Sequence, residues 1–280
     1  MTHDIRLIAC DLDGTLLNDK KELTPRTRAA LELAASKGIE FVPSSGRIFR
    51  GMPEAVRSLP FLHYVIAVNG ASVYDIRNDC PIFSARIPNE TAVQMLKIFA
   101  SFPAEYECYA DGWGYTPADL RERIEDFTSS AFVHSIVKNL RTPVDDLAAY
   151  IRSHFDGVEK VQMFTDDKAV LEEAARAVRA AFPDYPVTHA LDCNIEINAP
   201  GAGKGNALRA LISHLGITAD ETVAFGDGNN DIPMLEAAGT AVVMKNAQPE
   251  VLPYADIAAP DCNEEGVARV LEEILGLERP

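Results

Sequence analysis

Residues 8–17 read IACDLDGTLL, in which two acids follow directly behind an apolar run. The stretch 5–10 (IRLIAC) is short, continuous and apolar, a pattern typical of a strand buried on both faces of a parallel sheet. Asp11 and Asp13 stand two residues apart, where like charges repel, and Gly14 behind them permits a tight turn. We therefore expect both carboxylates at the carboxyl end of a buried strand, where open α/β sheets bind ligands.

Both ends of the chain alternate between strand and helix patterns. Residues 23–38 predict a helix that begins at Thr24 and Pro25. Gly38 stands just past its end. The other elements expected here are strands over residues 39–47, 64–75, 222–228, 240–245 and 256–260, and helices over residues 203–217 and 264–277. Parallel strands joined by helices define a doubly wound α/β sheet, which is the fold class that we expect.

The middle of the chain, residues 84–190, has a different pattern. It holds the only tryptophan, and none of its apolar strands is followed directly by a polar turn like the one behind residue 10. We therefore predict an α/β cap domain inserted between two halves of one sheet. Residues 1–83 and 191–280 would then form one discontinuous domain with a Rossmann-like, mostly parallel sheet. A chain of 280 residues is long enough for two domains.

The chain carries 26 basic and 42 acidic residues, a net charge of −16. This sign argues against nucleic acid and anionic membrane surfaces as partners, because phosphate backbones require a basic face. It leaves room for a small anionic substrate in a locally positive pocket. Since the five cysteines show no C-x-x-C spacing, and no apolar stretch fits a signal peptide or a bilayer span, we expect a cytoplasmic protein with free thiols. The sequence does not indicate an oligomeric state.

Four polar turns stand at or near the ends of predicted strands. They are DLDGT at 11–15, SSGR at 44–47, GAGKG at 201–205 and GDGNND at 226–231. An open α/β sheet would gather them at one edge, where their acids cannot all stay ionised without a counter-charge. A divalent cation with oxygen ligands, most simply Mg²⁺, supplies that charge.

The same set of residues suits a phosphate group. Mg²⁺ and Lys204 would neutralise its oxygens, while Ser45 and the backbone N–H groups of the tight turn would hydrogen-bond them. A carboxylate in such a site can attack phosphorus and form an aspartyl-phosphate. A second carboxyl group two residues further on can protonate the leaving alcohol and then activate water. For Arg47, substrate contact and a structural ion pair stay equally open.

Other ligand-binding patterns do not fit. An EF-hand needs glycine at its sixth loop position and glutamate at its twelfth, and loops counted from Asp11 or Asp227 fail this requirement. The stretch around Lys204 lacks the G-x-x-x-x-G-K-[ST] pattern of a P-loop, and the six histidines show no zinc-binding spacing. An aromatic turn in the middle region either lines a leaving-group pocket or packs in a core; its side chains are Tyr109, Asp111, Trp113 and Tyr115.

Four stretches in order, DLDGTLL, SSGR, KGNAL and GDGNNDIPM, resemble the signatures of the haloacid dehalogenase (HAD) superfamily of phosphatases. The long insertion and the NGA at residues 69–71 resemble its Cof-type subfamily, whose members carry a large α/β cap. The resemblance implies Asp11 as nucleophile and Asp13 as general acid and base. It further implies phosphate binding by Leu12 (through its N–H), Ser45, Gly46, Lys204 and Asn230, Mg²⁺ ligands from Asp11, the Asp13 carbonyl and Asp227, and an Asp231 that holds a metal-bound water or Lys204. Gly228 departs from the family pattern, which often has serine there.

We therefore expect a Mg²⁺-dependent phosphomonoester hydrolase that acts on a small phosphorylated metabolite, either a sugar phosphate or a phosphorylated cofactor. The inserted domain would close over the site and select the leaving group. Two alternatives stay open. A phosphotransferase or phosphomutase would pass the aspartyl-phosphate to a sugar hydroxyl, and a non-catalytic regulator would bind metabolites on the same fold.

Overall fold

The structure is a computed structural model that describes residues 4–276 in two compact units. The first unit comprises the described chain up to Ser84 and again from Gly203, and the second comprises Ala85–Ala202. This corrects the predicted boundary at residues 190 and 191. Strand β11 (Asn194–Asn198) pairs with β9 (Lys160–Phe164) of the inserted sheet, so the second unit continues past the predicted end.

One sheet forms the framework of the first unit. Across the described residues its order is β14 (Ile257–Ala259), β13 (Thr240–Met244), β12 (Thr222–Gly226), β1 (Leu7–Asp11), β2 (Glu40–Ser44), β3 (Tyr64–Ala67), β4 (Ser72–Asp75) and β5 (Cys80–Ser84). The strands from β14 to β3 are parallel, whereas β3, β4 and β5 pair antiparallel. The expected doubly wound, mostly parallel sheet is confirmed, with an antiparallel extension at one edge.

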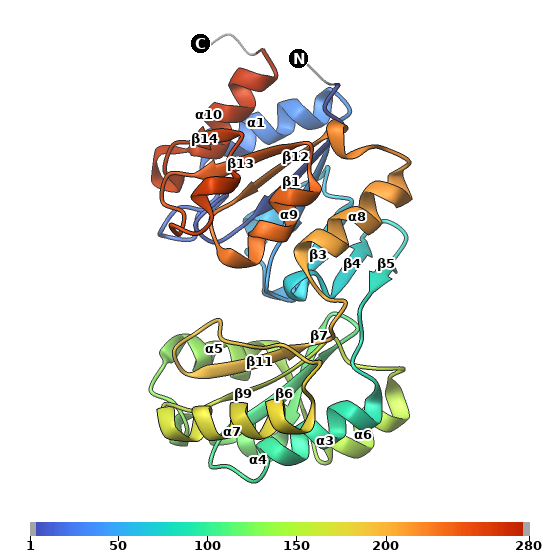
Figure 1. Ribbon diagram of the computed structural model, residues 1–280, viewed down its shortest axis with the longest axis vertical. Helices are drawn as coiled ribbons and strands as arrows, with labels where there is room; N and C mark the ends of the chain where they lie inside the picture. Colours follow the sequence, from blue (N-terminus) through green and yellow to red (C-terminus); the bar gives the residue numbers. More distant parts are fainter. Residues whose placement is uncertain (1–3, 277–280) are drawn as a thin grey trace. The chain divides into compact units, whose positions relative to one another are not determined.

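Helices lie on both sides of this sheet (Figure 1). They are α1 (Pro25–Ser36) and α10 (Gly266–Ile274), which contact each other, α8 (Lys204–Leu215) and α9 (Ile232–Ala237), which also contact each other, and the short α2 (Glu54–Arg57). Helix α1 begins where the sequence predicts, because the Thr24 side chain accepts a hydrogen bond from the N–H of Thr27. Leu208 and Leu211 of α8 pack with Leu7 of β1 in a buried apolar cluster, which anchors the helix over the central strands.

The run of residues 64–75, expected as a strand with turn residues at Asn69 and Gly70, folds into two antiparallel strands. A 3-10 turn, Val68–Gly70, joins β3 to β4. All three turn residues have left-handed backbone angles, with φ of 53°, 54° and 81°. This sharp reversal sends the chain straight back along the sheet edge, so no helical crossover follows β3.

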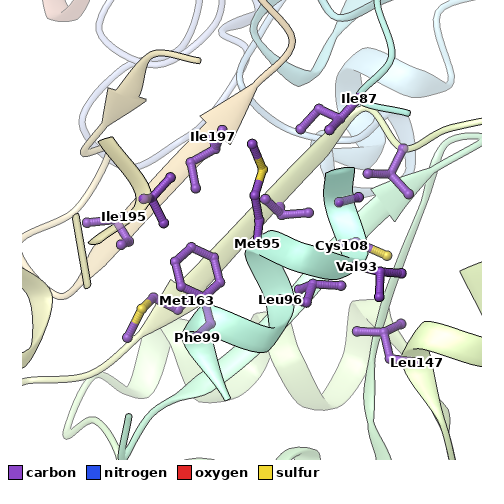
Figure 2. Packing of buried hydrophobic residues seen from close by; sticks show 14 of the residues in the cluster. Ile87, Val93, Met95, Leu96, Phe99, Cys108, Leu147, Met163, Ile195 and Ile197 are labelled. Atoms are coloured by element: carbon purple, nitrogen blue, oxygen red, sulfur yellow. The ribbon is translucent and has the colours of Figure 1, made fainter. Parts of the chain in front are cut away.

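The second unit is a sheet with helices on its faces (Figure 1). Its strands within the described chain are, in sheet order, β10 (Val187–Thr188), β11, β9, β6 (Glu105–Ala110), β7 (Trp113–Pro117) and β8 (Arg141–Val144). Its helices are α3 (Asn89–Phe99), α4 (Ala118–Glu122), α5 (Ala131–Leu140), α6 (Leu147–His154) and α7 (Lys168–Ala181). One sheet face is apolar: Met163, Ile195 and Ile197 pack with Phe99 of α3, as Figure 2 shows.

The opposite face of this second sheet carries buried charged side chains. Arg141 Nε lies 2.6 Å from Glu107 Oε2, and Lys160 Nζ lies 2.9 Å from Glu196 Oε1. The ring of Tyr109 contacts both cations, with its centroid 4.6 Å from the guanidinium carbon and 4.4 Å from the ammonium. All five side chains are almost fully buried, and the Tyr109 ring connects the two ion pairs.

The five cysteines are free thiols, as expected. Over residues 4–276, no helix has both the length and the apolar character that a membrane crossing requires.

Candidate active site

Polar side chains gather at the carboxyl ends of three neighbouring parallel strands of the first unit. Strand β1 lies between β12 and β2, with Asp11 opposite Ser44 and Cys10 opposite Phe225. The strands themselves are buried, so ionised groups are placed where each strand ends. At Gly14 an added Cβ would lie only 2.5 Å from Asp227 Oδ2, so glycine permits the turn after β1 to approach the turn after β12.

Lys204, the first residue of α8, reaches from its helix into this group of acids. Its Nζ lies 2.5 Å from Asp11 Oδ1 and 2.5 Å from Asp231 Oδ1, and the lysine is 1% exposed. Although burial lowers the pKa of Lys204, the two carboxylates raise it above its usual value. The lysine is therefore a fixed, buried positive charge.

The second oxygen of Asp231 is also engaged by the protein. Asp231 Oδ2 accepts hydrogen bonds from the backbone N–H groups of Asp227 and Gly228, at 3.0 and 2.9 Å. Asp231 thus contacts Lys204 with one oxygen and the turn after β12 with the other. The first contact orients the ammonium group of Lys204, and the second fixes the backbone of the turn that carries Asp227.

Carboxylates outnumber cations in this cluster. Oxygens of Asp11, Asp227 and Asp231 lie within 4.8 Å of one another. Burial raises the pKa of Asp11 to about 8, although Lys204 lowers it, and nearby acids add to the increase. Burial and the neighbouring carboxylates also raise the pKa of Asp227.

These observations make the cluster a suitable place for a divalent metal ion. Three carboxylates crowd around one lysine, so an additional positive charge would favour their ionised forms. All the donors are oxygens, which a hard cation such as Mg²⁺ prefers. Thr15 donates from Oγ1 to Asp227 Oδ1 at 2.6 Å and so fixes one of the carboxylates.

Asp13 lies beside this cluster and is held by two cations. Arg47 donates from Nε to Asp13 Oδ2 at 2.9 Å and from Nη2 to Oδ1 at 2.8 Å, and Lys21 Nζ lies 2.9 Å from Oδ1. Burial raises the pKa of Asp13, but the hydrogen bonds from Arg47 and Lys21 outweigh it, so the net shift is downward. Of the two roles left open for Arg47, the structure records the ion pair.

The predicted phosphate-binding residues surround the same strand ends. Ser45 is 2% exposed, and its Oγ accepts the N–H of Arg47 at 3.2 Å. The Leu12 side chain is fully buried, which leaves only its backbone for a ligand. Asn230 is exposed and donates from Nδ2 to Asn69 Oδ1 at 3.1 Å.

Several side chains near the site were not predicted to have a role. Thr15 lies in the DLDGT motif, so its hydroxyl could have been predicted to hydrogen-bond a carboxylate of the site. Asn69 was expected only as a turn residue, and nothing in the local sequence connects it to Asn230. Asn246 donates from Nδ2 to the carbonyl of Gly14 at 2.7 Å, a contact between segments 232 residues apart.

The aromatic turn of the middle region is divided between two environments of the second unit. Tyr115 packs against Tyr150 and Phe155, with ring centroids 5.3 and 5.1 Å away. Tyr109 belongs to the buried charged face, whereas Asp111 is exposed and lies 2.6 Å from Arg86. Packing therefore accounts for Tyr115 and Tyr109.

Comparison with known proteins gives consistent matches over nearly the whole chain. A family model of haloacid dehalogenase-like hydrolases matches residues 8–271. Phosphatase YwpJ of Bacillus subtilis is 31% identical over 287 residues, which cover 97% of this chain and 100% of that protein. The 5-amino-6-(5-phospho-D-ribitylamino)uracil phosphatase YcsE of the same bacterium is 28% identical over 268 residues, covering 96% and 95%. A crystal structure of a haloacid dehalogenase-like hydrolase from Bacteroides thetaiotaomicron aligns with a TM-score of 0.83 at 25% identity, covering 96% and 99%.

The sheet is Rossmann-like, and acids and a buried lysine gather at the carboxyl ends of its strands. This arrangement is typical of an α/β enzyme. This chain belongs to the haloacid dehalogenase-like hydrolases, and it is accordingly a hydrolase. The family resemblance carried by the four sequence stretches is confirmed.

Proposed function

We propose that this protein is a Mg²⁺-dependent phosphomonoester hydrolase that acts on small phosphorylated metabolites through an aspartyl-phosphate. The observation that carries the proposal is the buried Lys204, which lies against Asp11 in a cluster where carboxylates exceed cations. The relative that acts on a phosphorylated ribitylamino-uracil supports a small phosphorylated metabolite as the substrate class. A sugar phosphate or a phosphorylated cofactor belongs to the same class.

In the proposed reaction, a carboxylate oxygen of Asp11 forms a bond to phosphorus while the bond from phosphorus to the ester oxygen breaks. Lys204 holds Asp11 in place and offsets negative charge at the phosphate. Ser45, Asn230 and the backbone N–H groups of Leu12 and Gly46 would hydrogen-bond the phosphate oxygens. Water then attacks the aspartyl-phosphate and releases inorganic phosphate.

Mg²⁺ would be held by the carboxylates of Asp11 and Asp227 and by the carbonyl of Asp13, and it would supply positive charge that neutralises the phosphate. Asp231 would serve by holding Lys204, which it contacts at 2.5 Å. We assign the selection of the leaving group to the inserted unit, residues 85–202.

Asp13 is proposed as the proton-transferring group. Held by Arg47 and Lys21, its carboxyl group is ionised and is ready to accept a proton from water in the second step. To donate a proton to the leaving alcohol in the first step, it must first take up a proton from solvent, and loss of its contacts with Arg47 would favour this protonation. We propose that Arg47 exchanges between Asp13 and the substrate phosphate during turnover.

A phosphatase screen over a broad panel of phosphorylated metabolites tests the proposal. With Mg²⁺ we expect release of inorganic phosphate from a subset of the panel, and we expect EDTA to abolish it. Rates that are flat across the panel and independent of metal would refute the mechanism. An isomeric phosphate formed from a hexose phosphate, without free phosphate, would instead indicate a phosphomutase.

A further inference from the structure

Three consecutive residues of the first unit, Val68, Asn69 and Gly70, adopt left-handed backbone angles. Glycine does this freely and asparagine tolerates it, but the geometry is rare for a β-branched side chain such as that of Val68, which is fully buried. Such a conformation persists only where its surroundings hold it in place. The backbone N–H of Val68 donates to the carbonyl of Arg47 at 3.0 Å, and that of Asn69 donates to the carbonyl of Ser45 at 3.0 Å.

This turn contacts three of the predicted phosphate-binding segments: the turn after β2, the start of α8 and the turn after β12. A Cβ added at Gly46 would lie 2.9 Å from Asn69 Oδ1, so Asn69 packs directly on the turn after β2. A Cβ added at Gly70 would lie 2.5 Å from the backbone nitrogen of Lys204, so glycine lets the turn approach the start of α8. Asn69 Oδ1 also accepts a hydrogen bond from Asn230 Nδ2 at 3.1 Å.

From this geometry we propose that Asn69 is a positioning residue, which orients the amide of Asn230 for phosphate binding; the inference rests on the proposed function. A carbonyl oxygen can accept a hydrogen bond but not donate one, and the Asn230 side chain donates only from Nδ2, so Asn69 Oδ1 selects the rotamer of Asn230 that turns Nδ2 toward Asn69. The remaining N–H of that amide is then available to a phosphate oxygen. Without Asn69, the exposed amide can rotate and present its own carbonyl oxygen, which repels an anion.

Two variants separate the side chain of Asn69 from its backbone. Asn69→Gly removes the acceptor but keeps the left-handed conformation accessible, whereas Asn69→Ala removes the acceptor and also strains the turn. Asp79→Gly is a matched control, because Asp79 is left-handed with φ of 52° and lies in the exposed turn between β4 and β5.

The measurements are steady-state hydrolysis of p-nitrophenyl phosphate and the affinity for inorganic phosphate by isothermal titration calorimetry. For Asn69→Gly we expect KM and the dissociation constant of phosphate to rise about fivefold to tenfold, with kcat within about twofold of wild type, as for the loss of one oriented hydrogen bond. The double variant Asn69→Gly/Asn230→Ala should bind phosphate no more weakly than Asn230→Ala alone, because Asn69 acts through Asn230. Asp79→Gly should match the wild type in every measurement.

Unchanged phosphate affinity in Asn69→Gly would overturn the inference, and so would additive losses in the double variant. A wild-type protein that binds phosphate but hydrolyses no ester would overturn the proposed function alone, and calorimetry would still decide the role of Asn69. Equal losses of kcat and affinity in Asn69→Ala, with none in Asn69→Gly, would also refute the inference. They would show that Asn69 is needed for the left-handed backbone of the turn and not for its side-chain oxygen.

Discussion

Both units bury charged side chains, but the two groups differ in balance and in position. In the first unit, Lys204 lies against Asp11 and Asp231, with Asp227 close by, so acids exceed cations. This group stands at the carboxyl ends of parallel strands. Burial raises the pKa of Asp11 and of Asp227, which marks a site that would gain from an added cation.

In the second unit, two buried cations on one face of a sheet each pair with a buried carboxylate. Arg141 pairs with Glu107, and Lys160 pairs with Glu196. Burial raises the pKa of Glu105 well above its usual range, which favours a neutral side chain beside these pairs. The comparison teaches that buried charge alone does not indicate function; the distinguishing feature of the first group is its position at the carboxyl ends of parallel strands, where open α/β sheets bind ligands.

The largest expected effect is the loss of turnover when the cluster of Lys204, Asp11, Asp227 and Asp231 loses Asp11, the proposed nucleophile. Asp11→Asn should lower kcat by at least about 10⁴-fold, because an amide cannot form the aspartyl-phosphate. The fold should persist, since the amide has the same shape and Lys204 keeps its contact with Asp231. Activity assays together with circular dichroism check both expectations. Near wild-type turnover in the folded variant would show that another group attacks phosphorus.

Breaking a buried ion pair of the second unit should instead lower the free energy of unfolding. Arg141→Ala should lower the free energy of unfolding of the second unit by about 3–5 kcal/mol, because Glu107 is left buried without its cation. The single tryptophan, Trp113, lies in β7, so its fluorescence in urea reports on this unit. Replacing both partners by apolar residues, Glu107→Leu with Arg141→Met, should recover most of the loss. A loss below about 1 kcal/mol in Arg141→Ala would remove the distinction between the two groups.

Mg²⁺ binding should raise the stability of the first unit, which holds Asp11, Asp227 and Asp231, and leave that of the second unit unchanged. Mg²⁺ at about 100 times its dissociation constant should add about 2–3 kcal/mol to the stability of the first unit. Calorimetric melting should show this as a higher transition temperature that EDTA reverses. Asp227→Asn should remove the shift, whereas the control Asp126→Asn, an exposed acid of the second unit, should keep it in full. An equal shift in both variants would place the ion elsewhere.

The smallest effect concerns the ion pair of Asp13. Arg47 holds the pKa of Asp13 below its usual value, so Arg47→Ala should raise that pKa. If Asp13 accepts a proton during turnover, the acidic limb of the kcat/KM profile must move to higher pH. Arg28→Ala removes a more exposed ion pair, with Glu32, and should leave the profile unchanged. A profile that does not move in Arg47→Ala would exclude Asp13 as the titrating base.

Features that depend on neighbouring residues were predictable from the sequence. Thr24 and Pro25 predicted the start of α1, because an N-cap hydrogen bond spans only three residues. The apolar run before Asp11 predicted a buried parallel strand with a carboxylate at its end, and the structure has this arrangement. Four sequence stretches in order also indicated the family, which the matching family model confirms.

Features that depend on distant residues required the tertiary structure. Strand β11 (NIEIN) alternates polar and apolar residues, and its pairing with β9, on a segment at least 30 residues earlier, assigns it to the second unit. Asn69 and Asn230 are 161 residues apart, and Asp13 and Arg47 are 34 apart, so no local pattern connects them. Local sequence therefore determined the elements and the chemical groups at their ends. Packing decided which strands pair and which charges face each other, because both depend on contacts that form only when the chain is folded.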